Sequence, residues 1–232
     1  RDSSTSRGLG DVYKRQMSRP IKFVRRFCRI LGRIDMERFS SAFHFIYAII
    51  IFALENNTAF NSLFKNKNKL AVIHFIRMQV DCCLEVYACL LYRDKDKFFK
   101  FFKDGKPINK LTIGKQQLTS SYLCGELDRR YPGIAEIYKE GCKWVHPNTA
   151  LYRYVILLAL PDNVSYTGYK GKKYSEDKEE LKHIYKDMLL VNQILYKLLK
   201  ELVEPYKHRH PVSPIVVKPI KTRRKIGIGF YE

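Results

Sequence analysis

LAVIHFIRMQVDCCLEVYACLLY, residues 70–92, is the stretch that says most about the fold. At helical spacing it is apolar around most of its circumference, which is typical of a helix in a protein core. Its polar side chains fall three or four positions apart and share one face, which carries His74, Arg77, Asp81 and Glu85 and ends at Tyr92. Charged groups in a core must be paired, hydrated or functional. We therefore expect a central helix with one polar stripe.

The polar stripe has two interpretations. Arg77 and Asp81 are four residues apart, so one possibility is an ion network that fixes the register of packed helices. The other is a polar pocket in which Arg77 holds an anionic group while an acid or a histidine moves a proton. His146 is the candidate histidine. It ends a predicted helix over 134–146, on a face shared with Tyr138 and Cys142 that would meet Arg77 if the two helices pack together.

The remaining pattern predicts an all-α protein. Apolar residues recur at helical spacing between Pro, Gly and Ser punctuation, and no internal repeat is evident. Ser40 or Ser41 should begin the helix before the central one, which we expect to fray near Glu55. The short KLTIG stretch favours a brief strand, and clustered phenylalanines before it favour the core over nucleic-acid stacking. We predict a bundle of about six helices followed by a basic, proline-rich, extended tail.

Three regions are expected along the chain. Residues 1–16 precede Met17, show no apolar period and have the character of an adapter-derived, non-native leader. Residues 17–204 form the helical bundle. Residues 205–232 form the tail, with four prolines and a single acid, Glu232.

The net charge of +20 favours association with a polyanion, either nucleic acid or an anionic membrane surface. Many lysines also simply solubilise an aromatic-rich domain. The basic side chains concentrate toward the two ends of the chain. The candidate nucleic-acid-binding residues are Arg25, Arg26, Arg29, Lys221, Arg223, Arg224 and Lys225. Residues 19–34 are basic on one face, which suits phosphates, lipid head groups or an ordinary solvated helix.

The sequence argues against several classes of site. The six cysteines form no C-x-x-C pair, and without a signal peptide they indicate reduced, buried thiols in a cytoplasmic protein. Cys142 and His146 have no partner pair with metal-ligand spacing, so we predict no metal and no cofactor. There is no phosphate-binding loop and no nucleophile elbow. Residues 42–54 are apolar for thirteen positions only, so we expect a core helix and no transmembrane span.

Four motifs carry a resemblance to a known group. They are RMQVD (77–81), DGKPINKL (104–111), LTSSYL (118–123) and YKEGCKWVHP (138–147), and together they resemble a group of uncharacterised bacterial helical proteins. An Arg-bearing core helix followed by a helix ending in His is also distantly similar to the HEPN superfamily. That resemblance implies a helical bundle, often dimeric, and in some members a metal-independent RNase of toxin or phage-defence systems. There the His helps to activate a ribose 2′-hydroxyl.

Two functions follow as expectations. The first is a HEPN-like RNase or related effector with Arg77, Asp81 and His146 as its catalytic residues. No Arg lies close before His146, so Arg77 would act from another helix. The second is a non-catalytic helical module that binds nucleic acid or a protein partner through its basic termini. Binding to an anionic membrane is a third alternative.

Overall fold

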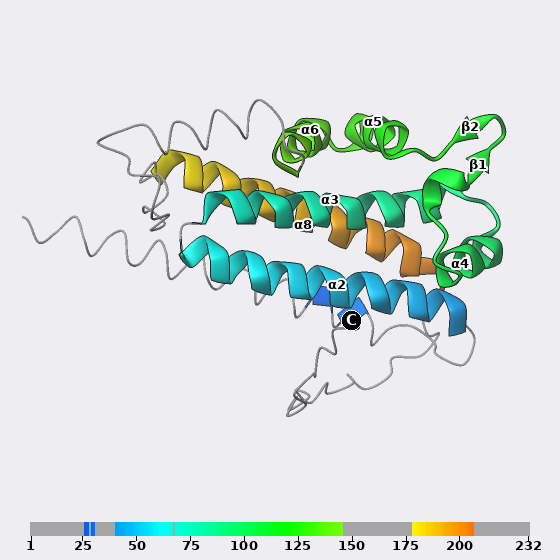
Figure 1. The fold of residues 1–232 in the computed structure, drawn as a ribbon. Helices are drawn as coiled ribbons and strands as arrows, with labels where there is room; N and C mark the ends of the chain where they lie inside the picture. The colour runs from blue at the N-terminus through cyan, green and yellow to red at the C-terminus, as the bar shows by residue number, and fades with distance from the viewer. Residues whose placement is uncertain (1–25, 28, 31–39, 67, 146–177, 207–232) are drawn as a thin grey trace, which may run out of the picture.

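The computed structural model describes residues 26, 27, 29, 30, 40–66, 68–145 and 178–206 (Figure 1). The described chain is almost entirely helical, and the prediction of an all-α bundle of about six helices is confirmed. The helices are α2 (Ser40–Lys65), α3 (Lys69–Leu91), α4 (Lys95–Lys103), α5 (Ser120–Arg130), α6 (Ile134–Val145) and α8 (Lys178–Val203). The predicted tail lies outside the described residues, apart from Pro205 and Tyr206, which belong to the short 3-10 helix η2 (Glu204–Tyr206).

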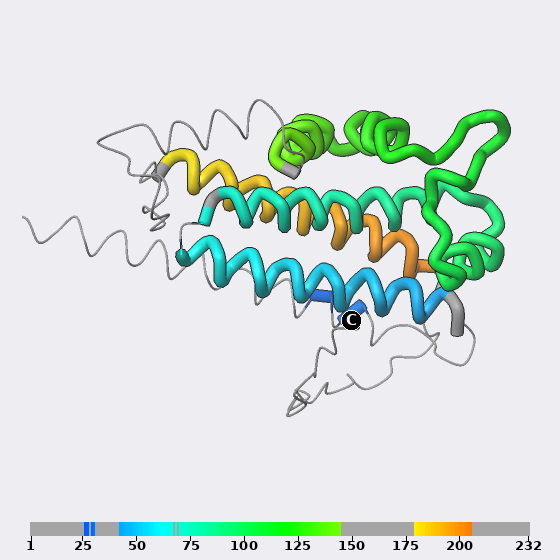
Figure 2. Tube along the Cα trace, viewed as in Figure 1, coloured from blue at the N-terminus to red at the C-terminus, as the bar shows by residue number. Residues whose placement is uncertain are grey.

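Helix α3 is the centre of the bundle, as its apolar circumference predicted. It packs against α8, α2, α6 and α5. Figure 2 shows α2, α3 and α8 as three long helices running alongside one another, with α5 and α6 across α3 on the side away from α2. The second half of α3 is the most deeply buried, and Val80, Cys83 and Val86 are fully enclosed. The residues of the polar stripe, by contrast, are only half-buried.

Helix α2 is longer than predicted. We expected fraying near Glu55, but the helix continues without a break to Lys65. The reason is that Asn56 and Asn57, which interrupt the apolar pattern, are only 3% and 5% exposed and use their amide groups inside the core. Polar residues that look like a helix end in the sequence are here part of the helix packing.

Helix α4 and a small hairpin close one end of the bundle. Phe98 and Phe99 of α4 are buried, and Phe101 and Phe102 are partly buried and pack against the core, so the prediction that the clustered phenylalanines belong to the core is confirmed. The Lys95 ammonium group donates hydrogen bonds to the carbonyls of Cys89, Leu90 and Tyr92, which ends α3. After the turn η1 (Ile108–Lys110), the predicted strand is present as β1 (Thr112–Ile113), paired antiparallel with β2 (Gln116–Gln117).

The junction between α5 and α6 is fixed by side-chain capping. Thr119 accepts from the Tyr122 amide and begins α5. One carboxylate oxygen of Asp128, near the end of α5, accepts from the amides of Gly133 and Ala135 at 3.0 and 2.9 Å, and so caps α6. Gly133 has a φ of 98°, a conformation that only glycine adopts easily. The cap ties the start of α6 to the end of α5.

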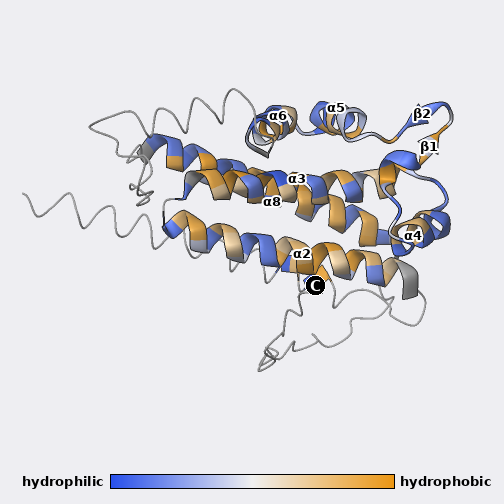
Figure 3. Cartoon of the chain, viewed as in Figure 1, coloured by the Kyte–Doolittle hydropathy of each residue, from blue (hydrophilic) through white to orange (hydrophobic). Residues whose placement is uncertain are grey.

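Among the described residues, one helical segment, Ala42–Lys65, is long and apolar enough to cross a membrane. A core helix of a bundle passes the same test. Figure 3 shows apolar residues on α2 both toward its neighbours and on its outer surface. The inner face carries buried Phe45, Ile46 and Ile50 and packs in the common core.

Candidate functional site

The polar stripe of α3 lies against α6, as its sequence spacing allowed. The guanidinium group of Arg77 forms an ion pair with the carboxylate of Asp81 one turn later. The Arg77 side chain is 14% exposed and that of Asp81 is 47% exposed. The stripe is therefore a half-buried seam between helices, with Arg77 on the inside and Asp81 toward solvent.

Helix α6 covers Arg77 with the face that carries Tyr138 and Cys142. The Arg77 guanidinium carbon lies 3.8 Å from the centroid of the Tyr138 ring, and its Nε donates to the Cys142 Sγ at 3.3 Å. The backbone approaches closely because Gly141 has no side chain, and a Cβ there would lie 2.9 Å from the Cβ of Arg77. This face of α6 therefore contacts Arg77, as expected if the two helices pack together.

The environment of Arg77 stabilises its charge. Burial by itself lowers the pKa of the guanidinium, but hydrogen bonds to Asp81 and Cys142 and the nearby negative charge outweigh it and raise the pKa. Burial raises the pKa of Tyr138, while the Arg77 charge acts in the opposite direction. Both residues therefore keep their ordinary protonation states at neutral pH, as expected of a structural contact.

Glu85 is the unusual titratable group of the stripe. Burial, together with the charge of Asp81, raises the pKa of its carboxyl to about 7. Its Oε2 is buried and has no hydrogen-bond partner in the described part of the chain. A carboxyl group that titrates near neutral pH can give and take a proton, which is the property required of a general acid or base.

The buried cysteines near the stripe are poor nucleophiles. Cys82, Cys83, Cys89 and Cys124 are buried and free, as predicted, and Cys142 is half-buried and free. Burial raises the pKa of Cys82 and Cys89 to about 12 and that of Cys124 to about 11. These thiols stay protonated at neutral pH, so thiolate chemistry is not available to them.

The space beside the stripe is small. A cavity of about 120 Å³ lies between α3, α6 and α8, and its lining includes Ile76, Gly141 and Trp144. Ligand pockets usually measure about 300–1,000 Å³, so this one has room for a few water molecules and not for a nucleotide. Among the described residues, no three His, Cys, Asp or Glu side chains gather to hold a metal ion.

Several predicted site residues lie outside the described part of the chain. His146 directly follows the last residue of α6, and no contact between it and Arg77 is described. The described part of the chain also leaves out Arg25, Lys221, Arg223, Arg224 and Lys225. Arg26 and Arg29 are described and are exposed, beside the buried Phe27.

The sequence interpretation missed a cluster of amides in the core. Asn57 of α2 and Asn192 of α8 exchange two hydrogen bonds of 3.0 and 2.6 Å, and Gln79 of α3 donates to the Asn192 oxygen at 2.8 Å. Asn56 donates to the Gln79 oxygen at 3.3 Å. The sequence does contain a sign of this cluster, because each of these amides interrupts an otherwise apolar helical face. Local spacing did not reveal that the three helices bring their amides to one point.

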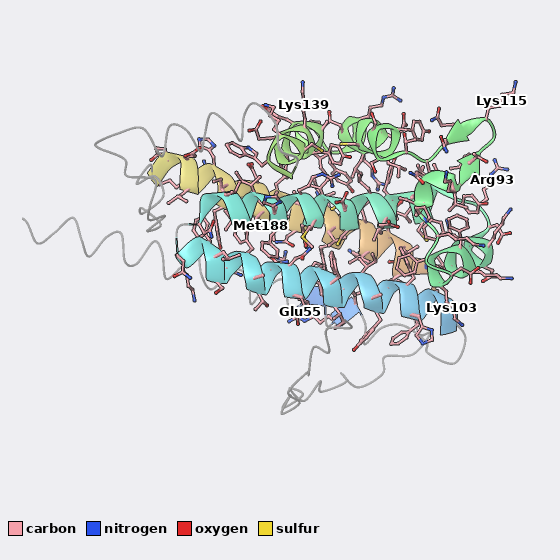
Figure 4. All side chains as sticks on the ribbon, in the orientation of Figure 1. Glu55, Arg93, Lys103, Lys115, Lys139 and Met188 are labelled. Carbon is pink, nitrogen blue, oxygen red and sulfur yellow. The ribbon has the colours of Figure 1, made fainter. Side chains whose placement is uncertain are left out.

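A strongly basic surface lies at the end of the bundle formed by residues 93–115. This segment holds 8 Lys and Arg against 3 Asp and Glu, a net charge of +5. The rest of the described chain holds 14 Lys and Arg against 12 Asp and Glu, a net charge of only +2. Seven of the eight basic side chains are exposed, and Figure 4 shows Arg93, Lys103 and Lys115 projecting from this end. We call this surface the basic end.

Comparison of the chain with protein-family models, with curated proteins and with solved structures found no match. The site geometry and the distribution of charge therefore carry the functional argument.

Proposed function

We propose that the protein is a helical module that binds nucleic acid through basic side chains projecting from a rigid bundle. The observation that carries the proposal is the basic end, which holds most of the net positive charge of the described residues and exposes seven of its eight basic side chains. Lysine and arginine held on a folded scaffold replace the counterions around phosphates, which is the main source of affinity for DNA and RNA.

The contacts inside the basic end support this role. Phe98 and Phe99 point into the core and fix α4, so its lysines are held facing outward. Phe98 and Phe99 are buried and so are not available to stack on bases. We therefore expect binding that depends on phosphates and varies little with sequence.

The basic termini belong to the same proposal. Arg26 and Arg29 are exposed, and the tail residues Lys221, Arg223, Arg224 and Lys225 add further charge close together in the sequence. Two basic segments of one chain act together when both reach the same polyanion. The contributions of the two basic termini to binding are separated by comparing alanine variants of Arg26 and Arg29 with alanine variants of the four tail residues.

The test is fluorescence anisotropy of the full chain with labelled single-stranded and duplex RNA and DNA over a series of salt concentrations. We expect the logarithm of the association constant to fall steeply and linearly with the logarithm of salt concentration. Weak binding without a salt dependence would exclude the proposal.

A metal-independent RNase is the second candidate, and Glu85 is the observation that favours it. Its carboxyl, with a pKa near 7, lies one turn from Asp81 and two turns from Arg77, so a proton-transfer group and a cation share one helix face. The resemblance to HEPN proteins points to the same chemistry with His146. Against it stands the engagement of Arg77 by Asp81, Tyr138 and Cys142, which leaves its guanidinium poorly placed to hold a phosphate.

RNA cleavage in EDTA distinguishes the candidates. The wild-type chain is compared with His146→Ala and Glu85→Gln, each checked for helix content by circular dichroism. Cleavage that disappears in both folded variants establishes the RNase. Binding without cleavage in all three proteins leaves the nucleic-acid-binding module.

A further inference from the structure

The outer face of α2 is apolar and exposed. Four large hydrophobic residues are exposed in the described chain, and three of them, Tyr47, Ile51 and Phe52, lie on this helix with exposures of 43%, 38% and 45%. Their spacing places them on one side of α2, and Phe43 extends the patch by stacking on Tyr47 with ring centroids 5.7 Å apart. We call these four residues of α2 the α2 patch. The fourth exposed hydrophobic residue, Ile113, stands apart in the hairpin.

The α2 patch carries no charge, but basic side chains lie close to it. The acidic and lysine residues of α2, Glu55 and Lys65, lie in its C-terminal half, and the exposed His44 lies in its N-terminal half next to Phe43. The N-terminal half packs against α4, where the rings of Phe45 and Phe102 meet edge to face with centroids 4.8 Å apart. The lysines of α4 are exposed at positions 97, 100 and 103. An aromatic surface, with the exposed Glu55 at its C-terminal edge, is thus bordered by a cationic helix.

The opposite face of α2 is tied into the bundle. Phe45, Ile46 and Ile50 are buried in the common core, and Asn57 exchanges hydrogen bonds with Asn192 of α8. Inserting α2 across a bilayer would break these contacts and carry the amides into hydrocarbon, which is costly. A membrane that meets this helix therefore meets its outer face alone, with the helix axis in the membrane plane.

We propose that the α2 patch docks the protein onto the surface of an anionic lipid bilayer. Tyr47, Ile51 and Phe52 enter the boundary between head groups and acyl chains, where tyrosine and phenylalanine are favoured. The lysines of α4 lie over the head groups, and each basic residue near an anionic surface strengthens the attraction. The inference goes beyond the proposed binding of nucleic acid, because it adds the apolar residues of the α2 patch to the lysines of α4 that also belong to the basic end.

Charge decides between a bilayer and a second copy of the chain as the occupant. Two copies each carrying a net charge of +20 repel one another, whereas an anionic bilayer attracts both. The exposed part of the patch, three large side chains, is also small for a stable dimer, which buries on the order of 800 Å² on each partner. A lipid surface needs no complementary shape, and each side chain that inserts into it adds to the binding affinity.

The test is cosedimentation of the full chain with vesicles of phosphatidylcholine alone and of phosphatidylcholine mixed with phosphatidylserine. The wild type should bind the mixed vesicles and leave the neutral ones largely unbound. Tyr47→Ser with Phe52→Ser should weaken binding by about tenfold or more, since each change removes an inserted apolar side chain. Ile113→Ser is the comparison variant, because it removes an exposed hydrophobic residue outside the α2 patch, and it should weaken binding far less than the double variant does.

A second measurement keeps the inference testable if the double variant folds poorly. Phe52→Trp should show a blue-shifted emission on adding mixed vesicles, beyond any change in the wild type, and should be quenched by lipids labelled near the head group. An unshifted spectrum, or equal binding by the double variant and the wild type, overturns the inference. So does a dimer in light scattering that the double variant abolishes, since the patch then meets a second copy. RNA binding should be unchanged in the double variant, which separates this result from a failure of the proposed function.

Discussion

The guanidinium carbon of Arg77 lies 3.8 Å above the centroid of the Tyr138 ring, on a helix that starts more than forty residues further along the chain. The same guanidinium pairs with Asp81 on its own helix and donates to Cys142 on α6. One cation is therefore shared by two helices. Arg77 links α3 to α6, and its first role is to hold the fold together.

Removing this link should destabilise the bundle. Arg77→Ala should lower the free energy of unfolding by about 1–3 kcal/mol, since the variant has neither the cation–π interaction nor the partly exposed ion pair. Tyr138→Leu should cost about 1 kcal/mol, because it removes the aromatic ring alone. Urea unfolding of the two single variants and the double variant gives the coupling energy, which we expect at about 0.5–2 kcal/mol. Strictly additive effects would show that the stacking contributes nothing.

Gly141 should tolerate no side chain. Gly141→Ala places a Cβ 2.9 Å from the Cβ of Arg77, so α6 must move away from α3, at a cost of about 1–3 kcal/mol. Gly125→Ala is the matched control, because it lies in α5 with nothing within 4 Å of the added Cβ. There the higher helix propensity of alanine should stabilise the protein by about 0.5–1 kcal/mol. Thermal unfolding of both variants measures the two changes in stability, which should have opposite signs.

Glu85 should make stability depend on pH. Its carboxyl has a pKa of about 7 in the folded protein and near 4.5 when unfolded, so the folded state binds more protons between these values. The free energy of unfolding should therefore fall as the pH rises from 4.5 to 7, by at most about 3 kcal/mol. Glu85→Gln should remove this part of the slope and be more stable than the wild type at pH values above about 8. Glu55→Gln, which removes an exposed carboxylate, should keep the slope, and urea titrations at several pH values measure both.

The amide pair of Asn57 and Asn192 should be costly to break on one side. Asn192→Leu leaves the amides of Asn57 and Gln79 buried without their partner, and we expect the free energy of unfolding to fall by about 2–4 kcal/mol. Replacing both asparagines by leucine removes the two amides together, so that neither asparagine is left buried without the other. The double variant should then be less destabilised than the sum of the single changes predicts. Additivity in urea unfolding would mean that the two amides act independently.

The sequence predicted the fold well where local spacing decides the structure. The apolar circumference of α3, the i,i+4 pair of Arg77 and Asp81, and the shared face of Tyr138 and Cys142 all follow from the helical period. The amide cluster and the close approach at Gly141 did not follow, because they depend on how separate helices cross. The basic end was also missed as a surface, since burial of Phe98 and Phe99 is what turns the neighbouring lysines outward.

The most direct measurement of the nucleic-acid-binding proposal compares two matched sets of alanine variants in the full chain. One removes Arg93, Lys110 and Lys115 from the basic end, and the other removes Lys139, Lys186 and Lys200 from α6 and α8; all six are exposed. RNA affinity is measured by anisotropy across a salt series. We predict that the first set weakens binding and reduces the salt slope by about 1 for each phosphate that is no longer neutralised, while the second has little effect. Equal weakening by the two sets, or none by either, would contradict the assignment of the basic end as the binding surface.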